Sequence, residues 1–266
     1  MRYSLIIIGV IIVFFESAFK FPSTYKLISK IPLDNGAFTT DNLQNVYVFE
    51  GNTLKKYNAS GALLYTHSDK SYGDITSVDV FDPMKVMVFY KGFPQIVYLD
   101  NTLSQNGNTI SPADMGYPLA SMACMSHDNG LWIYDDQVAQ LIRFDVNLTP
   151  LQKTGSLNQL LGISVNPISL SEYNGYEYLN DTTQGILVFD AFGTYYKTLP
   201  FIGLKHFEVS GDDVFYIQHH KLHSFHMKTI TEDIIMQPDS LATQARVEKN
   251  LLYEKYMDTL RVYEIK

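Results

Sequence analysis

The sequence predicts an all-β fold in which a unit of four short strands is repeated six times and closed into a ring, a β-propeller. Three observations support this prediction: the composition, a landmark that recurs along the chain, and the way the two ends complement each other. Of the 266 residues, 14% are aromatic and only 18% are charged. Aromatic and β-branched side chains pack well on a pleated surface, and no window shows a sustained apolar period of 3.6 residues, so the composition favours sheet over helix.

The recurring landmark is a short alternating apolar run that ends at a polar turn residue. The best-preserved copy lies in residues 39–66, where three such runs are separated by polar turns that contain Gly51 and Gly61. The residues that follow the second run of each unit are Asn58, Asp100, Asp145, Asp190, His226 and Glu264. They lie 36 to 45 residues apart, which is the spacing of propeller blades.

Further expected strands precede each landmark in the sequence. A matching run precedes it after a turn rich in Asp, Asn and Gly, residues that tolerate turn geometry. Five units also have an innermost strand further upstream, at 76–81, 119–125, 168–173, 206–209 and 242–247. Residues 157–161 and 236–242 are expected to form short helical turns between blades.

The two ends of the chain fit together. The last unit has only three runs, at 242–247, 251–254 and 260–265, whereas residues 25–33 form a strand with no hairpin partner before it. Pairing this first strand with the last blade would remove an unpaired sheet edge. We therefore predict a single six-bladed domain over 25–266, closed by the N-terminal strand.

The first 19 residues predict export. Arg2 precedes an apolar run at 5–15, which is shorter than the roughly 20 residues needed to span a bilayer and typical of a signal peptide. Ala18 suits the position before a cleavage site, but Glu16 occupies the −3 position, where a small residue is expected. Residues 1–19 are predicted to be a signal peptide, with an uncleaved N-terminal anchor as the alternative, and the domain to be periplasmic, extracellular or envelope-associated.

The net charge excludes some classes of binding partner, and the cysteine content bears on the core. The net charge of −8 argues against nucleic acid, which requires a basic surface, and against general attraction to anionic lipid. Membrane contact is expected only through an uncleaved N-terminal segment. The single cysteine, Cys124, lies in an apolar run and is expected to be a core residue.

One unit resembles a known family. Residues 41–48 (DNLQNVYV) and 54–61 (LKKYNASG) resemble a blade of the six-bladed NHL-repeat and SMP-30-like propellers. The resemblance implies the architecture, but it does not carry a function, because propellers host binding modules and enzymes alike.

Lactonases of the SMP-30 type hold a divalent ion on the propeller axis with Glu, Asn and Asp side chains. The residues that could do so here are Asp79, Asp82, Asn166, Glu172 and Glu208. Asp82 and Asn166 precede prolines and are expected to form turns. Asp79 and Glu172 lie in expected innermost strands, where a buried carboxylate needs a partner or a metal.

Four of the seven histidines fall within residues 219–226, namely His219, His220, His223 and His226. His219 and His220 occupy a predicted hairpin turn, and His223 and His226 point to opposite faces of a strand. We therefore expect an exposed, pH-sensitive hairpin at the end of a blade in preference to a metal site.

No nucleophile elbow, dinucleotide-binding motif or P-loop is present. The sequence therefore favours an exported, non-catalytic propeller that binds a protein, another ligand or a cell-envelope component, and it assigns no catalytic residue, cofactor or metal ligand. The alternative is a metal-dependent hydrolase of the lactonase type with Asp79, Glu172 and Glu208 near the axis.

Overall fold

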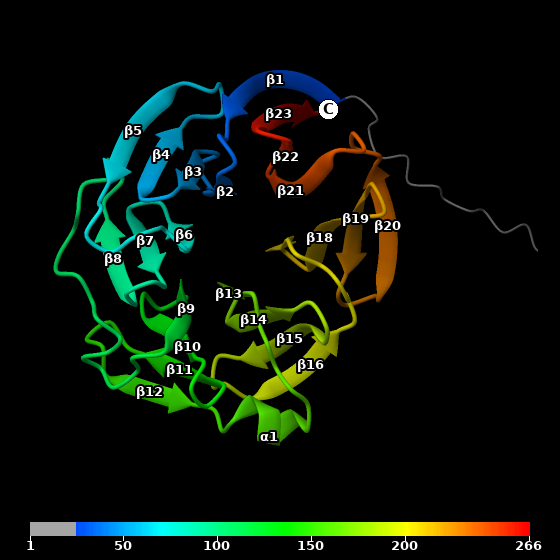
Figure 1. The fold of residues 1–266 in the computed structure, drawn as a ribbon. Coiled ribbons are helices and arrows are strands. Elements are labelled where there is room, and N and C mark those ends of the chain that lie inside the picture. The colour runs from blue at the N-terminus through cyan, green and yellow to red at the C-terminus, as the bar shows by residue number, and fades with distance from the viewer. Residues whose placement is uncertain (1–24) are drawn as a thin grey trace, which may run out of the picture.

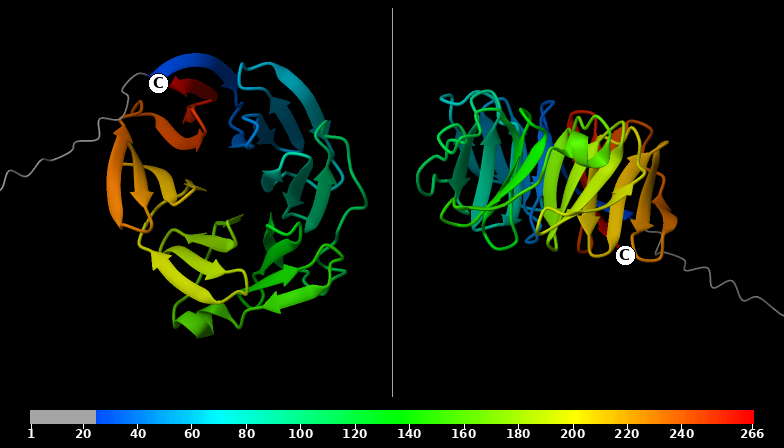
Figure 2. Two further views of the ribbon diagram at one scale, coloured as in Figure 1. Left: turned by 180° about the vertical axis from the view of Figure 1, so that it is seen from behind. Right: turned by 90° about the horizontal axis from the view of Figure 1, so that it is seen from below.

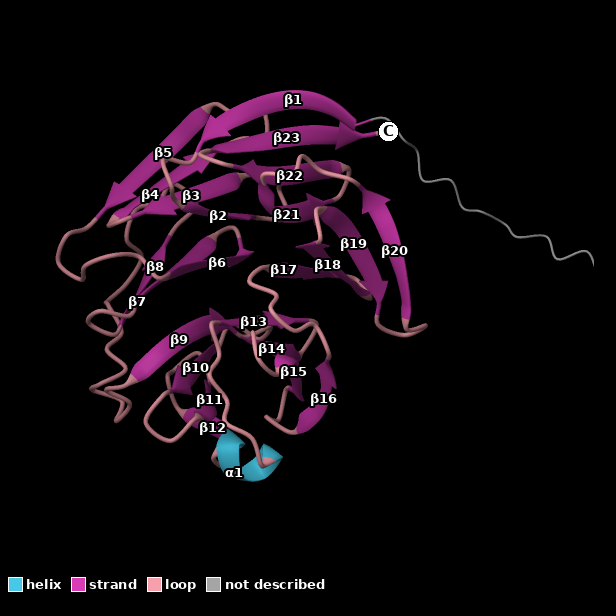
Figure 3. Ribbon diagram, turned by 45° about the vertical axis from the view of Figure 1, so that its right-hand side comes forward, coloured by secondary structure: helices cyan, strands magenta, loops and turns pink. Residues whose placement is uncertain are grey.

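The computed structural model describes residues 25–266, which form six small antiparallel sheets around a common axis (Figure 1). The strands stand side by side within each blade and account for nearly all the regular structure (Figure 3). This confirms the predicted propeller. The signal peptide or anchor predicted at 1–19 lies outside the described residues.

The first three blades follow one another along the chain. Blade 1 comprises β2 (Ala37–Thr40), β3 (Val46–Glu50), β4 (Thr53–Tyr57) and β5 (Leu63–Ser68). Blade 2 comprises β6 (Ser77–Asp82), β7 (Lys85–Tyr90) and β8 (Gln95–Leu99). Blade 3 comprises β9 (Ala120–Met125), β10 (Leu131–Asp135), β11 (Gln140–Phe144) and β12 (Pro150–Lys153).

The remaining blades complete the ring. Blade 4 follows the helix α1 (Leu157–Leu161) and comprises β13 (Ser169–Tyr173), β14 (Tyr176–Asp181), β15 (Gly185–Asp190) and β16 (Tyr195–Leu199). Blade 5 comprises β17 (Phe207–Ser210), β18 (Asp213–Gln218), β19 (Lys221–His226) and β20 (Thr231–Met236). Blade 6 comprises β21 (Ala242–Glu248), β22 (Leu251–Tyr256), β23 (Thr259–Ile265) and, from the other end of the chain, β1 (Tyr25–Pro32).

The predicted closure is confirmed. β1 pairs antiparallel with β23, from Tyr25 opposite Ile265 to Pro32 opposite Thr259. Ile31 of β1 is fully buried in the apolar cluster between blades 6 and 1. The first and last segments of the domain therefore form one sheet, which leaves no gap in the ring (Figure 1).

Blade 2 departs from the four-strand pattern. Its outer strand is reduced to two isolated bridges onto β8, Ile96 with Ile110 and Leu99 with Gln105. The irregular connection to blade 3 thus covers part of the β8 edge. Of the two helical turns expected, α1 is present, whereas 236–242 forms the end of β20 and a loop into β21.

The landmark residues of blades 1 to 4 act as turn caps. The Oδ1 atoms of Asp100, Asp145 and Asp190 each accept backbone N–H bonds from the residues two and four positions later. Asn58 accepts from the backbone of Ala62 in the same way. Each side chain thereby stabilises the hairpin between the third and fourth strands of its blade.

Apolar clusters fill the spaces between blades. Among the described residues there is one cluster for each pair of neighbouring blades. Trp132 and Leu179, for example, meet between blades 3 and 4. The blades are thus held face to face mainly by buried apolar surface.

All six innermost strands run in the same direction, so the ring has two distinct faces. The upstream face carries the loops that lead into these strands, at 33–36, 69–76, 111–119, 154–168, 200–206 and 237–241. The downstream face carries the loops that follow them. Seen from the side, α1 lies on the upstream face and the C-terminus on the downstream face (Figure 2).

Candidate functional site

The innermost strands enclose two adjoining cavities along the axis. The downstream cavity has a volume of about 480 Å³ and the upstream cavity about 580 Å³. Ser77, Ala123 and Leu170 line both, so the two cavities abut within the ring. Their charges differ: the downstream cavity is lined by acidic side chains and Arg246, whereas the upstream cavity has only Lys205 and His206 as charged or titratable lining residues.

The three carboxylates predicted near the axis, Asp79, Glu172 and Glu208, do line the same downstream cavity. Each, however, accepts a hydrogen bond from the backbone of a neighbouring blade. Met125 donates its N–H to Asp79 Oδ2 at 2.8 Å, from blade 3 to blade 2. Val247 donates its N–H to Glu208 Oε2 at 2.7 Å, from blade 6 to blade 5.

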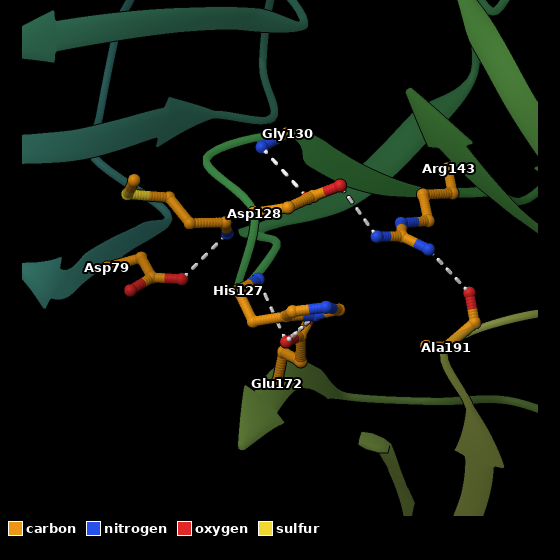
Figure 4. Close-up of polar contacts among 8 residues, drawn as sticks. Asp79, His127, Asp128, Gly130, Arg143, Glu172 and Ala191 are labelled. Carbon is orange, nitrogen blue, oxygen red and sulfur yellow. Dashed lines mark hydrogen bonds and ion pairs between the residues drawn. The ribbon is translucent and has the colours of Figure 1, made fainter. Parts of the chain in front are cut away.

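Glu172 of blade 4 makes a double contact with blade 3. Its Oε1 accepts the His127 backbone N–H at 2.9 Å and lies 2.8 Å from His127 Nδ1 (Figure 4). Close by, Arg143 of blade 3 donates to the carbonyl of Ala191 in blade 4 at 2.7 Å and to Asp128 at 2.8 Å (Figure 4). The blade 3–4 junction is therefore joined at two points.

The other junctions are bridged in related ways. Arg246 of blade 6 pairs with Glu208 of blade 5 at 2.8 Å and donates from Nε to Thr40 of blade 1 at 2.9 Å. Gly211 of blade 5 donates to the Tyr173 hydroxyl of blade 4 at 2.7 Å. Lys56 of blade 1 donates to the Asn101 carbonyl of blade 2 at 3.0 Å. A side-chain hydrogen bond thus crosses every one of the six junctions.

These contacts explain why carboxylates occur on the innermost strands. Burial raises the pKa of Asp79 and Glu208 above the ordinary range, and backbone N–H donors, with Arg246 beside Glu208, act against that rise. Within residues 25–266, no three His, Cys, Asp or Glu side chains come together in an arrangement that could hold a metal ion. Through the hydrogen bonds that they accept, Asp79, Glu172 and Glu208 link neighbouring blades.

Of the two remaining candidates, Asp82 ends β6 and caps the turn that follows it, whereas Asn166 lies in an irregular loop and not in the turn expected. Asp82 accepts the backbone N–H of Met84 in the hairpin between β6 and β7. Asn166 donates its own N–H to Asp181 at 2.7 Å, in the loop that leads into β13. Neither lines the downstream cavity.

One buried carboxyl group was not foreseen. Glu177 lies directly opposite Glu172 across the β13–β14 pair and is fully buried. Neither of its carboxyl oxygens has a hydrogen-bond partner among the described residues. Burial, reinforced by the negative charge of Glu172, raises the pKa of Glu177 to about 9. No sequence motif marks this residue, because the polar cluster forms only when blades 3 and 4 pack together.

The histidine hairpin lies away from the axis. His219 and His220 form the exposed turn between β18 and β19, with φ of 50° and 58°, as predicted. His223 differs from the expectation because it is half-buried: its ring stacks on Tyr216, with centroids 5.1 Å apart, and Nδ1 lies 2.7 Å from Glu232. Cys124 is buried, as predicted.

The upstream cavity combines basic groups with apolar walls. Lys205 and His206 come directly before β17, and neither forms an ion pair with any of residues 25–266. Burial and the positive charges of Lys255 and Lys205 lower the pKa of His206. The apolar lining consists of Ala37, Phe38, Phe49, Met122, Ala123, Ile168 and Leu170.

Exposed apolar side chains are found on both faces. Those on upstream-face loops and hairpins are Phe93, Leu119, Val138, Leu160, Ile168, Ile202, Leu241 and Met257. Those on downstream loops include Leu43, Met84, Val146, Phe192 and Ile230.

Comparison with known proteins identifies the fold and no family. No family model and no curated protein matches the sequence. The WD40 domain of Neurospora crassa Pan2 is similar in structure, with a TM-score of 0.66 at 8% identity, over 91% of this chain and 95% of that domain.

Two further similar structures have different roles. A catalytically inactive variant of Staphylococcus aureus virginiamycin B lyase with quinupristin has a TM-score of 0.57 at 11% identity, over 86% of this chain and 80% of that one. BBS1N in complex with ARL6DN has a TM-score of 0.56 at 13% identity, over 88% of this chain and 78% of that one. At such low identity these likenesses support the propeller fold alone. Within residues 25–266, no helix has the length and apolar character needed to cross a bilayer.

Proposed function

We propose that this protein is an exported, non-catalytic β-propeller that binds a protein partner through loops on one face of the ring. The observation that carries the proposal is the use of the axial carboxylates. Asp79, Glu172 and Glu208 are the residues a hydrolase would present to a metal, yet each accepts a backbone N–H from the adjacent blade. A ligand that bound Asp79 Oδ2, Glu172 Oε1 or Glu208 Oε2 would have to break hydrogen bonds that join the blades.

The exposed loops support a binding role. Loops on a rigid scaffold are where binding residues concentrate, and both faces carry exposed apolar side chains there. The structurally similar BBS1N was crystallised with a protein partner, which is consistent with this role for the fold. The more specific kinship with NHL-repeat and SMP-30-like propellers is part of the proposal and rests on the first blade.

A site-specific photo-cross-linker tests the proposal and locates the face. Phe93 on the upstream face and Phe192 on the downstream face are matched in type and exposure, at 68% and 69%. Each would be replaced in turn by a photoreactive phenylalanine analogue in the full chain, in the cells that produce it. We expect one defined cross-linked protein from one position. The absence of any cross-linked protein from either position, together with a hydrolytic activity lost on substituting Glu172, would overturn the proposal.

Export is tested separately. If residues 1–19 are a signal peptide, mass spectrometry of the protein from the cell envelope or medium will find a chain that begins near Phe19. A chain that retains residues 1–19 and fractionates with the membrane would instead support the anchor. A full-length chain confined to the cytoplasm would contradict export.

A further inference from the structure

We propose that the upstream cavity is the partner-binding site and that it receives an apolar peptide segment bearing carboxylate side chains. This inference rests on the proposed function, because it names the surface and the chemistry by which a protein partner would be recognised. Lys205, His206 and the apolar residues around them carry the argument.

The charged groups at the upstream cavity are basic. Lys205 and His206 are exposed at the mouth of the cavity, and no acidic side chain lines it. Lys255 adds a third basic group nearby, held in place because its Nζ donates to the Gly36 carbonyl at 2.8 Å. The negative charge of Asp258, in the adjoining hairpin, raises the pKa of Lys255 and partly offsets the lowering caused by burial. The Lys205 ammonium, which forms no ion pair within residues 25–266, attracts carboxylates specifically in a chain with a net charge of −8, and the His206 imidazole beside it offers a ring N–H as a hydrogen-bond donor.

The two ends of the axis differ in the charge of their lining residues. The cavity holds about 580 Å³, enough for side chains of an inserted peptide segment. At the other end of the axis, Glu172, Glu208 and Glu248 line the downstream cavity, where only Arg246 is basic. A carboxylate is therefore attracted to the upstream end and repelled from the downstream end, which gives an acidic segment one preferred side of entrance.

Apolar side chains line the upstream cavity beside Lys205 and His206. Ile168 is half exposed at the rim of the cavity, while Phe38, Met122 and Leu170 form its walls. Other loops of the upstream face carry the exposed Ile202 and Leu241. A basic centre within an apolar surround favours a ligand with carboxylates beside leucine- or phenylalanine-like side chains. A nucleic acid would offer anionic groups without the apolar side chains that these walls require.

Fluorescence polarisation with defined peptides tests the inference. The probe is a fluorescein-labelled peptide that alternates glutamate with leucine and phenylalanine, and its control has lysine in place of glutamate. The full chain, in mild detergent, would be compared with K205E, H206A and I168S. The matched control is K249E, because Lys249 is an exposed lysine on the downstream face. Melting curves establish that each variant is folded.

We expect saturable binding of the acidic peptide, weakened about tenfold or more by K205E and to a lesser extent by H206A and I168S, with K249E like the wild type. Equal binding of the lysine peptide, an equal effect of K249E, or no binding of the acidic peptide would overturn the inference. If K205E fails to fold, H206A and I168S decide the question. A partner that cross-links to the protein but binds K205E and I168S normally would refute this site and leave the proposed function standing.

Discussion

Glu172 in blade 4 accepts the His127 backbone N–H of blade 3 at 2.9 Å, and its Oε1 lies 2.8 Å from the His127 ring nitrogen. The carboxylate side chain is almost fully buried, whereas the imidazole is partly exposed. The same buried oxygen therefore meets one backbone N–H and one partly solvated ring. This contact shows how a carboxylate on the axis links two blades of the ring.

Replacing Glu172 by Ala should destabilise the protein by about 1–3 kcal/mol at pH 7, because the His127 N–H loses its buried acceptor. The matched control is H127A, which removes the ring contact but keeps the backbone hydrogen bond and should cost less. Urea unfolding of both variants provides the measurement. An equal loss in the two variants, or no loss in E172A, would contradict the assigned role.

Glu177 predicts an unusual dependence of stability on pH. Its pKa is raised from 4.5 in the unfolded chain to about 9 by burial and by Glu172, so the folded state holds a proton that the unfolded state releases. Its contribution to stability is fully present below pH 4.5 and is lost as the pH rises toward 9, with a slope of up to about 1.4 kcal/mol per pH unit. Replacing Glu177 by Gln should leave stability near pH 4.5 little changed and raise it at pH 8. Equal pH slopes in wild type and E177Q, measured by chemical unfolding, would refute this.

Gly185 should tolerate no side chain. It begins β15 with a φ of 98°, and an added Cβ would lie 2.3 Å from the Leu199 carbonyl oxygen. G185A is therefore expected to lower stability by about 3 kcal/mol or more. Gly107 is the matched control: its φ is 88° but nothing lies within 4 Å, so G107A should cost only the backbone strain of about 1–2 kcal/mol. Thermal unfolding that ranks the two variants the other way would show that this strand pairing is less rigid than described.

The junction between blades 5 and 6 should open before the others. Its apolar cluster has three buried members, Leu222, Ala245 and Leu252, whereas the cluster between blades 3 and 4 has eleven. Less buried apolar surface means a smaller free energy of local opening. Hydrogen exchange should therefore be faster for the amides of β18 and β19 than for those of β10. Slower exchange in β18 and β19 would argue that Arg246 and Glu208 dominate at this junction.

The repeat could be predicted because it depends on contacts between residues that are close in the sequence. The turn residues Asp100, Asp145 and Asp190 cap hairpins within a few positions of themselves, so their spacing reports the blades directly. The pattern weakens where local chemistry changes. His226 pairs with Asp213 in place of a turn cap, and Glu264 lies near the end of β23 with no hairpin to follow.

The roles of the site residues could not be predicted in the same way. Asp79, Glu172 and Glu208 were placed on innermost strands, but their partners lie 39 to 46 residues away and depend on how neighbouring blades pack. Lys205 and His206 belong to no recognisable motif, and their common cavity forms only when the blades close into a ring. The signal that could have found them is their position, two adjacent basic residues at the start of an innermost strand, where such strands open onto the axis.

We propose that the axial carboxylates join blades and do not serve a metal-dependent reaction. Thermal unfolding of the full chain, after dialysis against a chelator and with Ca²⁺ or Zn²⁺ then added, tests it most directly, with E208Q as the comparison variant. We expect the same melting temperature with and without either ion, and a lower one for E208Q in all conditions because the Arg246 ion pair is lost. A rise of several degrees with one ion in the wild type, absent from E208Q, would contradict the account and restore the hydrolase alternative.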